Sequence, residues 1–361
     1  MKIISGFPKK IVEYAHALEH LADHLPNDVK RVLLVTGEKS WQATKEVVQP
    51  ALSKEERIFE RVVVTAYPTQ KLIDAFSSVV REQQLEAVIG IGGGRVCDVA
   101  KAVANETSAF LMAVPTIAAT NAAFRKNSIL YEENGAYAGG NQNASTADVL
   151  LIDTAIIGAA PRRYLIAGMI DSVSRSVDTR PYTVDSDNFV LAFIHQNAQL
   201  ATDYLLKISE RYAEGELSEA ELAQAVDAII SVVGVAGAKS KGRMYRGVTH
   251  PLHNELTKLV HHPDILHGEI IAFTTLVQLL LEGSDYEWYL RFLRNLKFHF
   301  EIDALGLADE ETIQLLAHHF VAHFTEEVAF FITDLSEERV VSAIKEAKQI
   351  LVTEVFSDGG D

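Results

Sequence analysis

Three histidines and one aspartate have the types and spacing that could hold a metal ion. His250 and His253 lie in "THPLHN", three residues apart and so on one face of a helix, and His267 follows in "LHGE". Asp171 lies in "AGMID", far upstream of the histidines. One carboxylate and two imidazoles suit zinc and leave a coordination position open for a substrate or a water molecule. The residues alone therefore offer a metal site as one interpretation, but their types and spacing are not sufficient to favour it.

Two other sets of histidines also have helical spacing. His16, His20 and His24 share one face of a predicted helix, and so do His319 and His323. Either set has the spacing for a metal site, but each lies in a polar, surface-like helix with no glycine turn or apolar pocket beside it. The sequence therefore favours solvated histidines at both places.

A glycine turn in "VIGIGGGRVCDVAKAVA", residues 88–104, is the second candidate for chemistry. Its glycines, at 90 and 92–94, follow a predicted strand and open a predicted helix. There, backbone N–H groups carry partial positive charge and a phosphate can approach closely. The turn is not a P-loop, nor is it the usual dinucleotide fingerprint, because Arg95 stands where the third glycine belongs. Phosphate binding is the favoured interpretation, with a tight structural turn as the alternative.

The segments that position these residues have two different rhythms. The first 160 residues or so alternate short β-rich runs with amphipathic segments, which predicts βαβ units and a mostly parallel sheet covered on both faces. After about Arg162 the strand signal stops and long amphipathic helices follow. We therefore expect an α/β domain over residues 1–161 and an all-α domain over residues 162–361. Ligands of open α/β sheets bind at the carboxyl ends of the strands, so the active site is expected in the cleft between the two domains.

Individual elements can be predicted from the same periodicity. The segments expected as strands are 32–35, 61–65, 87–91, 110–114 and 147–153. The segments expected as helices are 39–53, 69–83, 97–107, 188–215, 309–324 and 336–350, with a capping box at 218–221 opening a further one.

Composition limits the class of protein and its partners. A length of 361 residues favours two domains, and 48% hydrophobic with 23% charged residues is typical of a globular protein. The net charge of −16 argues against nucleic acid or an anionic membrane surface as partner. There is no signal-peptide pattern and no apolar run of about 20 residues, and the single cysteine, Cys97, excludes a disulfide framework. We expect a cytoplasmic protein whose partner is a small molecule.

Four blocks occur in order along the chain: "GIGGGRVCDVAK", "VPTIAAT", "LLIDTAIIGAAPRRYLIAGMID" and "HPLHNELTKLVHHPDILHGE". Together they resemble the glycerol dehydrogenase branch of the iron-containing alcohol dehydrogenase family, over about residues 30 to 285. The family's architecture, a dinucleotide-binding α/β domain followed by a helical metal-binding domain, matches the two rhythms. The resemblance implies a homo-oligomeric oxidoreductase that uses a metal and NAD or NADP and transfers a hydride between the nicotinamide and a secondary alcohol or ketone.

The resemblance also implies roles for individual residues. Asp171, His250 and His267 are expected to bind one zinc ion per subunit, with His253 beside them as a non-ligand that relays a proton. Members of the strictly iron-type branch carry a further histidine ligand where this chain has Arg175, so a zinc-type site is expected. The residues expected at the cofactor are Gly37, Gly93, Gly94, Asp98, Thr116, Ala119, Arg125, Asn127 and Tyr131. For Asp98, a first-turn acid favoured by the helix dipole is the alternative.

The chain departs from the family in the segment expected to face the substrate. Asn121 replaces an aspartate that helps hold a polyol, and Arg125 and Asn127 replace small or apolar residues. We therefore expect Asn121 and Arg125, with His253, to act in catalysis. Arg125 and Arg175 near the metal predict an anionic substrate, a 2-hydroxy or 2-oxo acid or a polyol phosphate. The alternatives are that Arg125 contacts cofactor phosphates and that Arg175 pairs with an acid such as Asp178.

The choice of cofactor and of reaction leaves further alternatives. Gly37 stands where many NAD-using relatives have aspartate, and with Lys39 and Ser40 it favours tolerance of NADP, unless Glu38 and Lys39 are exposed loop charges. One rival function is a lyase or cyclase resembling dehydroquinate synthase, which recycles NAD internally. The other is a nucleotide-binding relative that has lost catalysis, against which the complete metal set argues.

Overall fold

The computed structural model describes residues 6–141, 143, 145–183, 189–237, 247–260, 264–328, 331–332 and 334–356. The chain forms two compact units. Unit 1 consists of Met1–Leu165 and Glu219–Lys239, and unit 2 of Ile166–Ser218 and Ser240–Asp361. The sequence predicts a single domain boundary between residues 161 and 162, whereas the chain passes between these units at three places.

Unit 1 is built on a six-stranded sheet whose neighbouring strands are all parallel, in the order β1-β8-β5-β4-β2-β3. The central strands are buried along their whole length, which explains their continuous apolar runs. The sheet strands are β1 (Lys10–Tyr14), β2 (Arg31–Thr36), β3 (Ile58–Val63), β4 (Ala87–Gly92), β5 (Phe110–Pro115) and β8 (Val149–Asp153). A separate antiparallel hairpin pairs β6 (Ser128–Tyr131) with β7 (Tyr137–Asn141).

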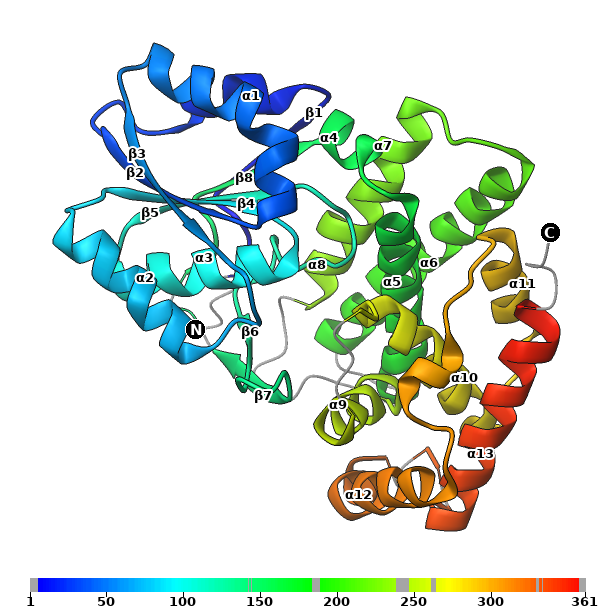
Figure 1. Cartoon of the computed structure of the whole chain (residues 1–361). Helices are drawn as coiled ribbons and strands as arrows, with labels where there is room; N and C mark the ends of the chain where they lie inside the picture. The colour runs from blue at the N-terminus through cyan, green and yellow to red at the C-terminus, as the bar shows by residue number, and fades with distance from the viewer. Residues whose placement is uncertain are drawn as a thin grey trace. The chain divides into compact units, whose positions relative to one another are not determined.

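Helices cover both faces of this sheet, with α1 on one side and α2 and α3 on the other (Figure 1). The first half of the chain contributes the 3-10 helix η1 (Ala17–His24) and the helices α1 (Glu38–Lys54), α2 (Gln70–Glu82), α3 (Gly94–Thr107) and α4 (Thr154–Ala159) to unit 1. A later segment adds α7 (Glu219–Asp227), the π-helix η2 (Ala228–Val232) and α8 (Val233–Gly237). Helix α7 belongs to unit 1 because it packs on α4. A Cβ at Gly158 of α4 would lie 2.6 Å from Leu222, so the absent side chain permits this close approach.

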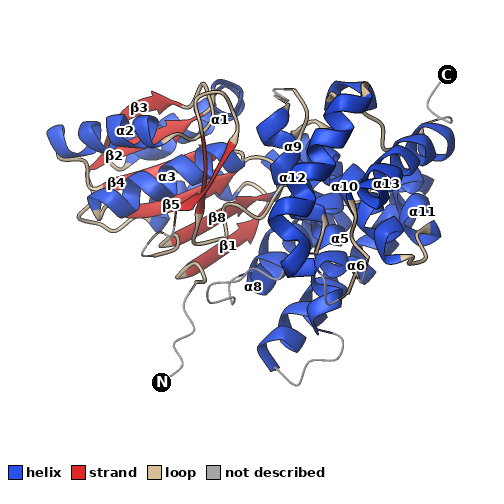
Figure 2. Ribbon diagram, turned by 90° about the horizontal axis from the view of Figure 1, so that it is seen from below, coloured by secondary structure: helices blue, strands red, loops and turns tan. Residues whose placement is uncertain are grey.

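The described part of unit 2 is helical and contains no strand (Figure 2). Its helices are α5 (Arg162–Thr183, whose first turn lies in unit 1), α6 (Phe189–Glu214), α9 (Thr249–Leu259), α10 (His267–Glu282), α11 (Glu287–Asn295), α12 (Glu310–Val328) and α13 (Glu337–Ile350), with the 3-10 helix η3 (Ile302–Leu305) and the π-helix η4 (Leu351–Val355). Helix α10 is apolar on nearly all sides and almost wholly buried, which makes it the core element of the unit. Across the described residues, no helix is both long and apolar enough to span a membrane.

These elements confirm the predicted fold class, an α/β part with a parallel sheet followed by a helical part. The structure departs from the sequence prediction at two further places. The edge strand β1 was not expected, because its residues are half exposed and give no continuous apolar run. His16, His20 and His24 do not share an α-helical face. His16 has a left-handed backbone (φ 66°), and a 3-10 helix with a kink at His20 follows it, so four-residue spacing no longer aligns the side chains.

A buried lysine fixes the segment that leads from β5 to the hairpin. Lys101 of α3 has no exposed surface, and its Nζ donates to the backbone oxygens of Ala122 (2.7 Å), Arg125 (3.1 Å) and Asn127 (2.6 Å). The same Nζ lies 2.8 Å from Oδ1 of Asp98, one turn earlier on α3. A buried charge is tolerated only when it is paired and hydrogen-bonded, and here both conditions are met. Lys101 therefore determines the path of residues 122–127.

We expect Lys101→Met to lower the free energy of unfolding by about 3–5 kcal/mol, because it leaves the Asp98 carboxylate and the three carbonyls without their cation. Lys71→Met is the matched control, since Lys71 is 83% exposed and pairs only with Glu133 among the contacts described. That change should cost less than about 1 kcal/mol. Urea denaturation measures both. Similar losses in the two variants would show that the buried contacts of Lys101 are not what stabilises the fold.

The edge strand β1 carries a carboxyl group with an unusual pKa. Burial, reinforced by the nearby charge of Asp227, raises the pKa of Glu13 from 4.5 to about 7. The folded state therefore holds this proton more tightly than the unfolded state does. The associated stability is full below pH 4.5 and is lost as the pH rises to about 7.

We expect Glu13→Gln, a neutral mimic of the protonated acid, to raise the free energy of unfolding at pH 8 and to leave it unchanged at pH 4. Since Glu13 is partly exposed, we expect about 1 kcal/mol rather than the full value of the shift. Glu60→Gln, an exposed glutamate on the opposite edge strand β3, is the control. Thermal melts between pH 4 and 8 measure the effect, and parallel profiles for wild type and Glu13→Gln would contradict it.

Candidate functional site

The structure brings Asp171, His250 and His267 together inside unit 2. Their donor atoms all lie within 4.8 Å of one another, although the residues come from α5, α9 and α10. Nε2 of His250 lies 3.2 Å from Oδ1 of Asp171, and Nε2 of His267 lies 3.5 Å from the same oxygen. Two imidazole nitrogens and one carboxylate oxygen thus converge on one point, as a three-ligand metal site requires.

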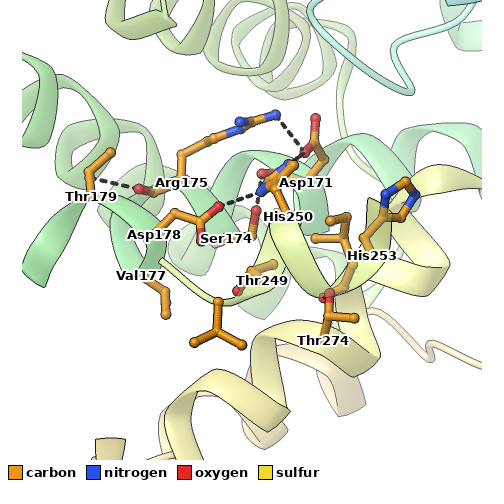
Figure 3. Close-up of polar contacts among 12 residues, drawn as sticks. Asp171, Ser174, Arg175, Val177, Asp178, Thr179, Thr249, His250, His253 and Thr274 are labelled. Carbon is orange, nitrogen blue, oxygen red and sulfur yellow. Dashed lines mark hydrogen bonds and ion pairs between the residues drawn. The ribbon is translucent and has the colours of Figure 1, made fainter. Parts of the chain in front are cut away.

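Asp178 orients the first of these imidazoles (Figure 3). Its Oδ2 makes a short contact with Nδ1 of His250, and the Asp178 side chain is almost fully buried. A carboxylate that accepts the Nδ1 proton leaves the Nε2 lone pair directed at Asp171. This arrangement is typical of a histidine that binds a metal.

Asp171 remains ionised although it is buried. Burial alone would raise its pKa, but the Arg175 guanidinium, with the neighbouring imidazoles of His250 and His267, holds the pKa of Asp171 well below its usual range. Nη2 of Arg175, one turn later on α5, donates to Oδ1 of Asp171 at 3.2 Å (Figure 3). Arg175 therefore pairs with Asp171, whereas Asp178, considered from the sequence as its partner, contacts His250.

His253 lies against His267 on the other side of the site. Nε2 of His253 and Nδ1 of His267 share a hydrogen bond of 2.9 Å, while Nδ1 of His253 bonds to Oδ1 of Asn254 at 3.1 Å. Burial, with the neighbouring His267, holds the pKa of His253 well below its usual range, and burial also lowers the pKa of His267. Both rings are therefore neutral near pH 7, which is the form that binds metals.

Two packing features bring the three helices to this point. A Cβ at Gly268 would lie 2.1 Å from the backbone oxygen of Ala167, so only glycine lets α10 begin this close to α5 and places His267 beside Asp171. Oε1 of the buried Gln278 accepts hydrogen bonds from the backbone N–H groups of Val248 and Thr249, while its Nε2 donates to the backbone oxygen of Val177. The first turn of α9, which carries His250, is thereby tied to α10 and α5.

In unit 1 the glycines of the turn have two separate tasks. A Cβ at Gly90 would lie 2.5 Å from Cβ of Ala100, and one at Gly92 2.7 Å from Val96, so these two glycines allow α3 to pack closely on β4. Gly93 precedes α3 and Gly94 opens it. Their missing side chains face the segment that follows β5, with Ile117 2.7 Å from an ideal Cβ on Gly93. The first turn of α3 presents the backbone N–H groups that the phosphate prediction requires.

The residues predicted at the cofactor lie around this turn at the carboxyl ends of β4 and β5. The N–H of Thr116 donates to the backbone oxygen of Gly92, and Ser128 Oγ donates to that of Asp98. Burial raises the pKa of Asp98, an effect that Lys101 opposes. Burial, with the Asp98 charge, also raises the pKa of Tyr131 to about 12, so this phenol is protonated. Asp98 is thus an acid with a lysine partner as well as a candidate cofactor residue.

The segment between β5 and β6 holds the remaining predicted residues, Ala119, Asn121, Arg125 and Asn127. Asn121 is buried, and its backbone oxygen accepts hydrogen bonds from Phe124 and Arg125. The charge of Arg125 is close enough to lower the pKa of Asp98, which places this arginine near the cofactor residues.

The polar residues that follow β2 form hydrogen bonds and an ion pair with neighbouring groups of unit 1. Gly37 precedes α1, and its N–H donates to Oγ of Ser40 at 3.0 Å, while that hydroxyl donates to the backbone oxygen of Ile91 at 2.8 Å. Glu38 pairs with Nη2 of Arg61 at 2.7 Å. Ser40 therefore acts as a helix cap, and the prediction that it helps accept NADP has no support from these contacts.

Sequence reasoning missed the roles of Asp178, Lys101 and Gln278. Asp178 follows Asp171 by two helical turns and so lies on the same face of α5, a signal that the spacing contains. Lys101 follows Asp98 by three residues, which also places the two on one face. Gln278 has no such signal, because its partners are backbone groups of other helices.

Comparison with known proteins agrees with this architecture. The family model described as iron-containing alcohol dehydrogenase matches residues 8–154. Glycerol dehydrogenase of Citrobacter freundii is 30% identical over 258 residues, which cover 68% of this chain and 69% of that protein. Hydroxycarboxylate dehydrogenase A of Escherichia coli is 29% identical over 294 residues, 79% of each chain.

A solved structure extends the agreement to the whole fold. The probable glycerol dehydrogenase of Sinorhizobium meliloti superposes with a TM-score of 0.80 at 24% identity and covers 97% of this chain and 99% of its own. The parallel sheet, the helical part and the relatives at this level of identity point to one group of alcohol oxidoreductases. The chain therefore belongs to the iron-containing alcohol dehydrogenase family and lies in its glycerol dehydrogenase-like branch.

Proposed function

We propose that this protein is a metal-dependent oxidoreductase that transfers a hydride between NAD or NADP and a secondary alcohol or its ketone. The observation that carries the proposal is the convergence of His250 Nε2 and His267 Nε2 on Oδ1 of Asp171, with Asp178 holding the other nitrogen of His250. A buried carboxylate with two imidazoles and an orienting second carboxylate fits a divalent metal better than it fits a structural cluster.

Zinc is the metal we propose, with Fe(II) as the competitor. The donor set has one oxygen and two nitrogens and leaves positions open, which suits zinc and is also the donor set of Fe(II) oxygenases. Arg175, one turn after Asp171, fills the position from which a further histidine would bind. The three-ligand arrangement therefore favours the zinc-type members of the family.

Each residue of the site would have its own role in the reaction. When bound, the metal would polarise the C–O bond of the substrate, and the nicotinamide would exchange a hydride with the carbon. Asp178 would keep His250 in the tautomer whose Nε2 is free to bind. Arg175 would hold Asp171 as a carboxylate. His253 has partners on both ring nitrogens, which supports a positioning role toward His267, while the proton relay predicted from the sequence stays a prediction.

The cofactor is proposed to bind at the first turn of α3. Gly93 and Gly94 precede and open this turn, and Asp98, Thr116 and Tyr131 lie around it. Of the remaining predicted residues, Ala119, Arg125 and Asn127 lie in the segment after β5, and Gly37 lies at the end of β2. Glu38, next to Gly37, pairs with Arg61, so the end of β2 carries both an acid and a guanidinium, and both NAD and NADP are kept as candidate cofactors.

The substrate is proposed to be an anion, a 2-hydroxy or 2-oxo acid or a polyol phosphate. Arg175 supports this less than the sequence suggests, because it pairs with Asp171. The proposal therefore rests on Arg125, on the replacement of an acid by Asn121, and on similarity to a hydroxycarboxylate dehydrogenase. Homo-oligomer formation stays a prediction.

We expect Asp171→Asn, His250→Ala and His267→Ala each to bind one zinc ion fewer per chain than the wild type and to lose nearly all turnover. Asp178→Asn should keep the ligands but weaken zinc binding about 10- to 100-fold, because a neutral amide oxygen accepts the hydrogen bond from Nδ1–H of His250 more weakly than a carboxylate does. His299→Ala, which removes an exposed imidazole of unit 2, is the control. Metal analysis after dialysis, with zinc and Fe(II) compared, provides the measurement. Unchanged metal content in the three ligand variants would overturn the site.

We expect the wild type to oxidise or reduce anionic substrates more efficiently than glycerol. A screen of alcohols, 2-hydroxy acids and polyol phosphates with NAD and NADP measures this, and net formation of NADH or NADPH excludes a lyase that recycles its cofactor.

Arg125→Ala should lower kcat/KM for the best anion roughly 10- to 100-fold, because a charge-assisted contact contributes about 1.5–3 kcal/mol. Lys126→Ala is the control for loss of positive charge from the same segment. A preference for glycerol, or equal losses for neutral and anionic substrates, would contradict an anionic substrate.

A further inference from the structure

Helix α9 carries a buried carboxylate that the proposed function does not use. Glu255 has only 1% of its surface exposed. Its Oε1 accepts a hydrogen bond from Nζ of Lys258 at 2.6 Å, but its Oε2 is buried without a hydrogen-bond donor among the described residues. A buried carboxylate oxygen without a donor is costly, so an additional partner at Oε2 would stabilise this part of the fold.

Two imidazoles of α12 face this same oxygen. Helix α12 packs on α9 (Figures 1 and 2), and His319 and His323 lie one turn apart on it. Nδ1 of His323 lies 3.4 Å from Oε2 of Glu255, and Nδ1 of His319 lies 3.9 Å from it. The sequence offers these two histidines only as a surface pair, whereas the fold places them on a buried acid.

We infer that Glu255, His319 and His323 form a second binding site for a divalent transition metal, of which zinc is the expected ion. The donor set is again one carboxylate oxygen and two imidazole nitrogens. Ligand atoms of a tetrahedral zinc site lie about 3.3 Å apart, and Oε2 of Glu255 already lies 3.4 and 3.9 Å from the two imidazoles. The ligand atoms of all three residues do not yet lie within 4.8 Å of one another, so binding would require the two imidazole rings to rotate toward each other. The two imidazole centroids are 6.0 Å apart, close enough for both rings to turn toward one ion.

The surroundings determine how such an ion would be held. The His323 side chain is 55% exposed and that of His319 35%, so an ion can enter from solvent while Glu255 forms the buried floor of the site. Lys258 is the opposing charge, but it contacts Oε1 and leaves Oε2 to the imidazoles. Because the ligands come from α9 and α12, the bound ion would link these two helices.

This second site is independent of the set around Asp171, since the two share no residue. Its role is therefore structural or regulatory rather than catalytic. Metal binding to the native state alone stabilises it in proportion to the logarithm of metal concentration, so zinc should raise the melting temperature even when the Asp171 set is disabled.

The test is equilibrium dialysis of the full chain against zinc alone, followed by metal analysis. We expect two zinc ions per chain in the wild type, one in Asp171→Asn, one in His323→Ala and none in the double variant. His318→Ala is the matched control, because His318 is the exposed neighbour on α12 and contacts Glu337 rather than Glu255. This control should keep both ions, and His323→Ala should retain normal turnover.

A single zinc ion in the wild type that Asp171→Asn loses and His323→Ala keeps, or two ions in His323→Ala, would overturn the second site. Loss of the ion from the His318→Ala control would also overturn it, since that residue is not a ligand. Glu255→Gln extends the test to the carboxylate, and the His323 variant keeps the test valid if the glutamine variant does not fold. If Asp171→Asn keeps two ions while His323→Ala loses one, the proposed catalytic site fails and the second site stands.

Discussion

The helical unit depends on one buried negative charge. Asp171 is 2% exposed, and a carboxylate in that environment is stable only with positive or hydrogen-bonding partners around it. Arg175 supplies one partner from the same helix, and the imidazoles of His250 and His267 reach the same carboxylate from α9 and α10. The close contact of Gly268 with α5 and the hydrogen bonds of Gln278 hold α5, α9 and α10 together next to the Asp171 carboxylate. The same contacts therefore pack the helices of the unit and place the residues of the site.

The α/β unit also contains a buried charge that needs partners, the ammonium group of Lys101. Lys101 directs its three backbone hydrogen bonds at the segment after β5, and this fixes the residues predicted to contact the cofactor. Asp98 is held by the same lysine, so the acid expected at the cofactor also supports that segment. A change at either residue alters both the fold and the proposed cofactor site, and only paired substitutions separate the two effects.

Much of the architecture could be predicted from the sequence because it depends on local periodicity. The buried strands β2, β4, β5 and β8 are continuous apolar runs, and the long helices keep an apolar face, so both were predicted within a few residues. The half-exposed edge strand β1 and the kinked η1 give no such signal. The return of α7 to the α/β unit depends on its packing against Gly158, which no pattern within α7 reveals.

The two histidine sets of the helical unit show where local spacing stops being informative. By spacing alone, His319 and His323 are as suitable for a metal as His250 and His253, and the sequence separates them only by the polarity of their neighbours. The structure separates them by the carboxylate that each set meets. Asp171 is enclosed and has cationic and hydrogen-bonding partners on several sides, whereas Oε2 of Glu255 is buried under two rings that reach solvent. An enclosed set with an orienting acid is suited to chemistry on a substrate, and an open set between two helices is suited to holding those helices together. Two sets with the same three donor types thus suit different roles, because their exposure to solvent and their neighbouring charged groups differ.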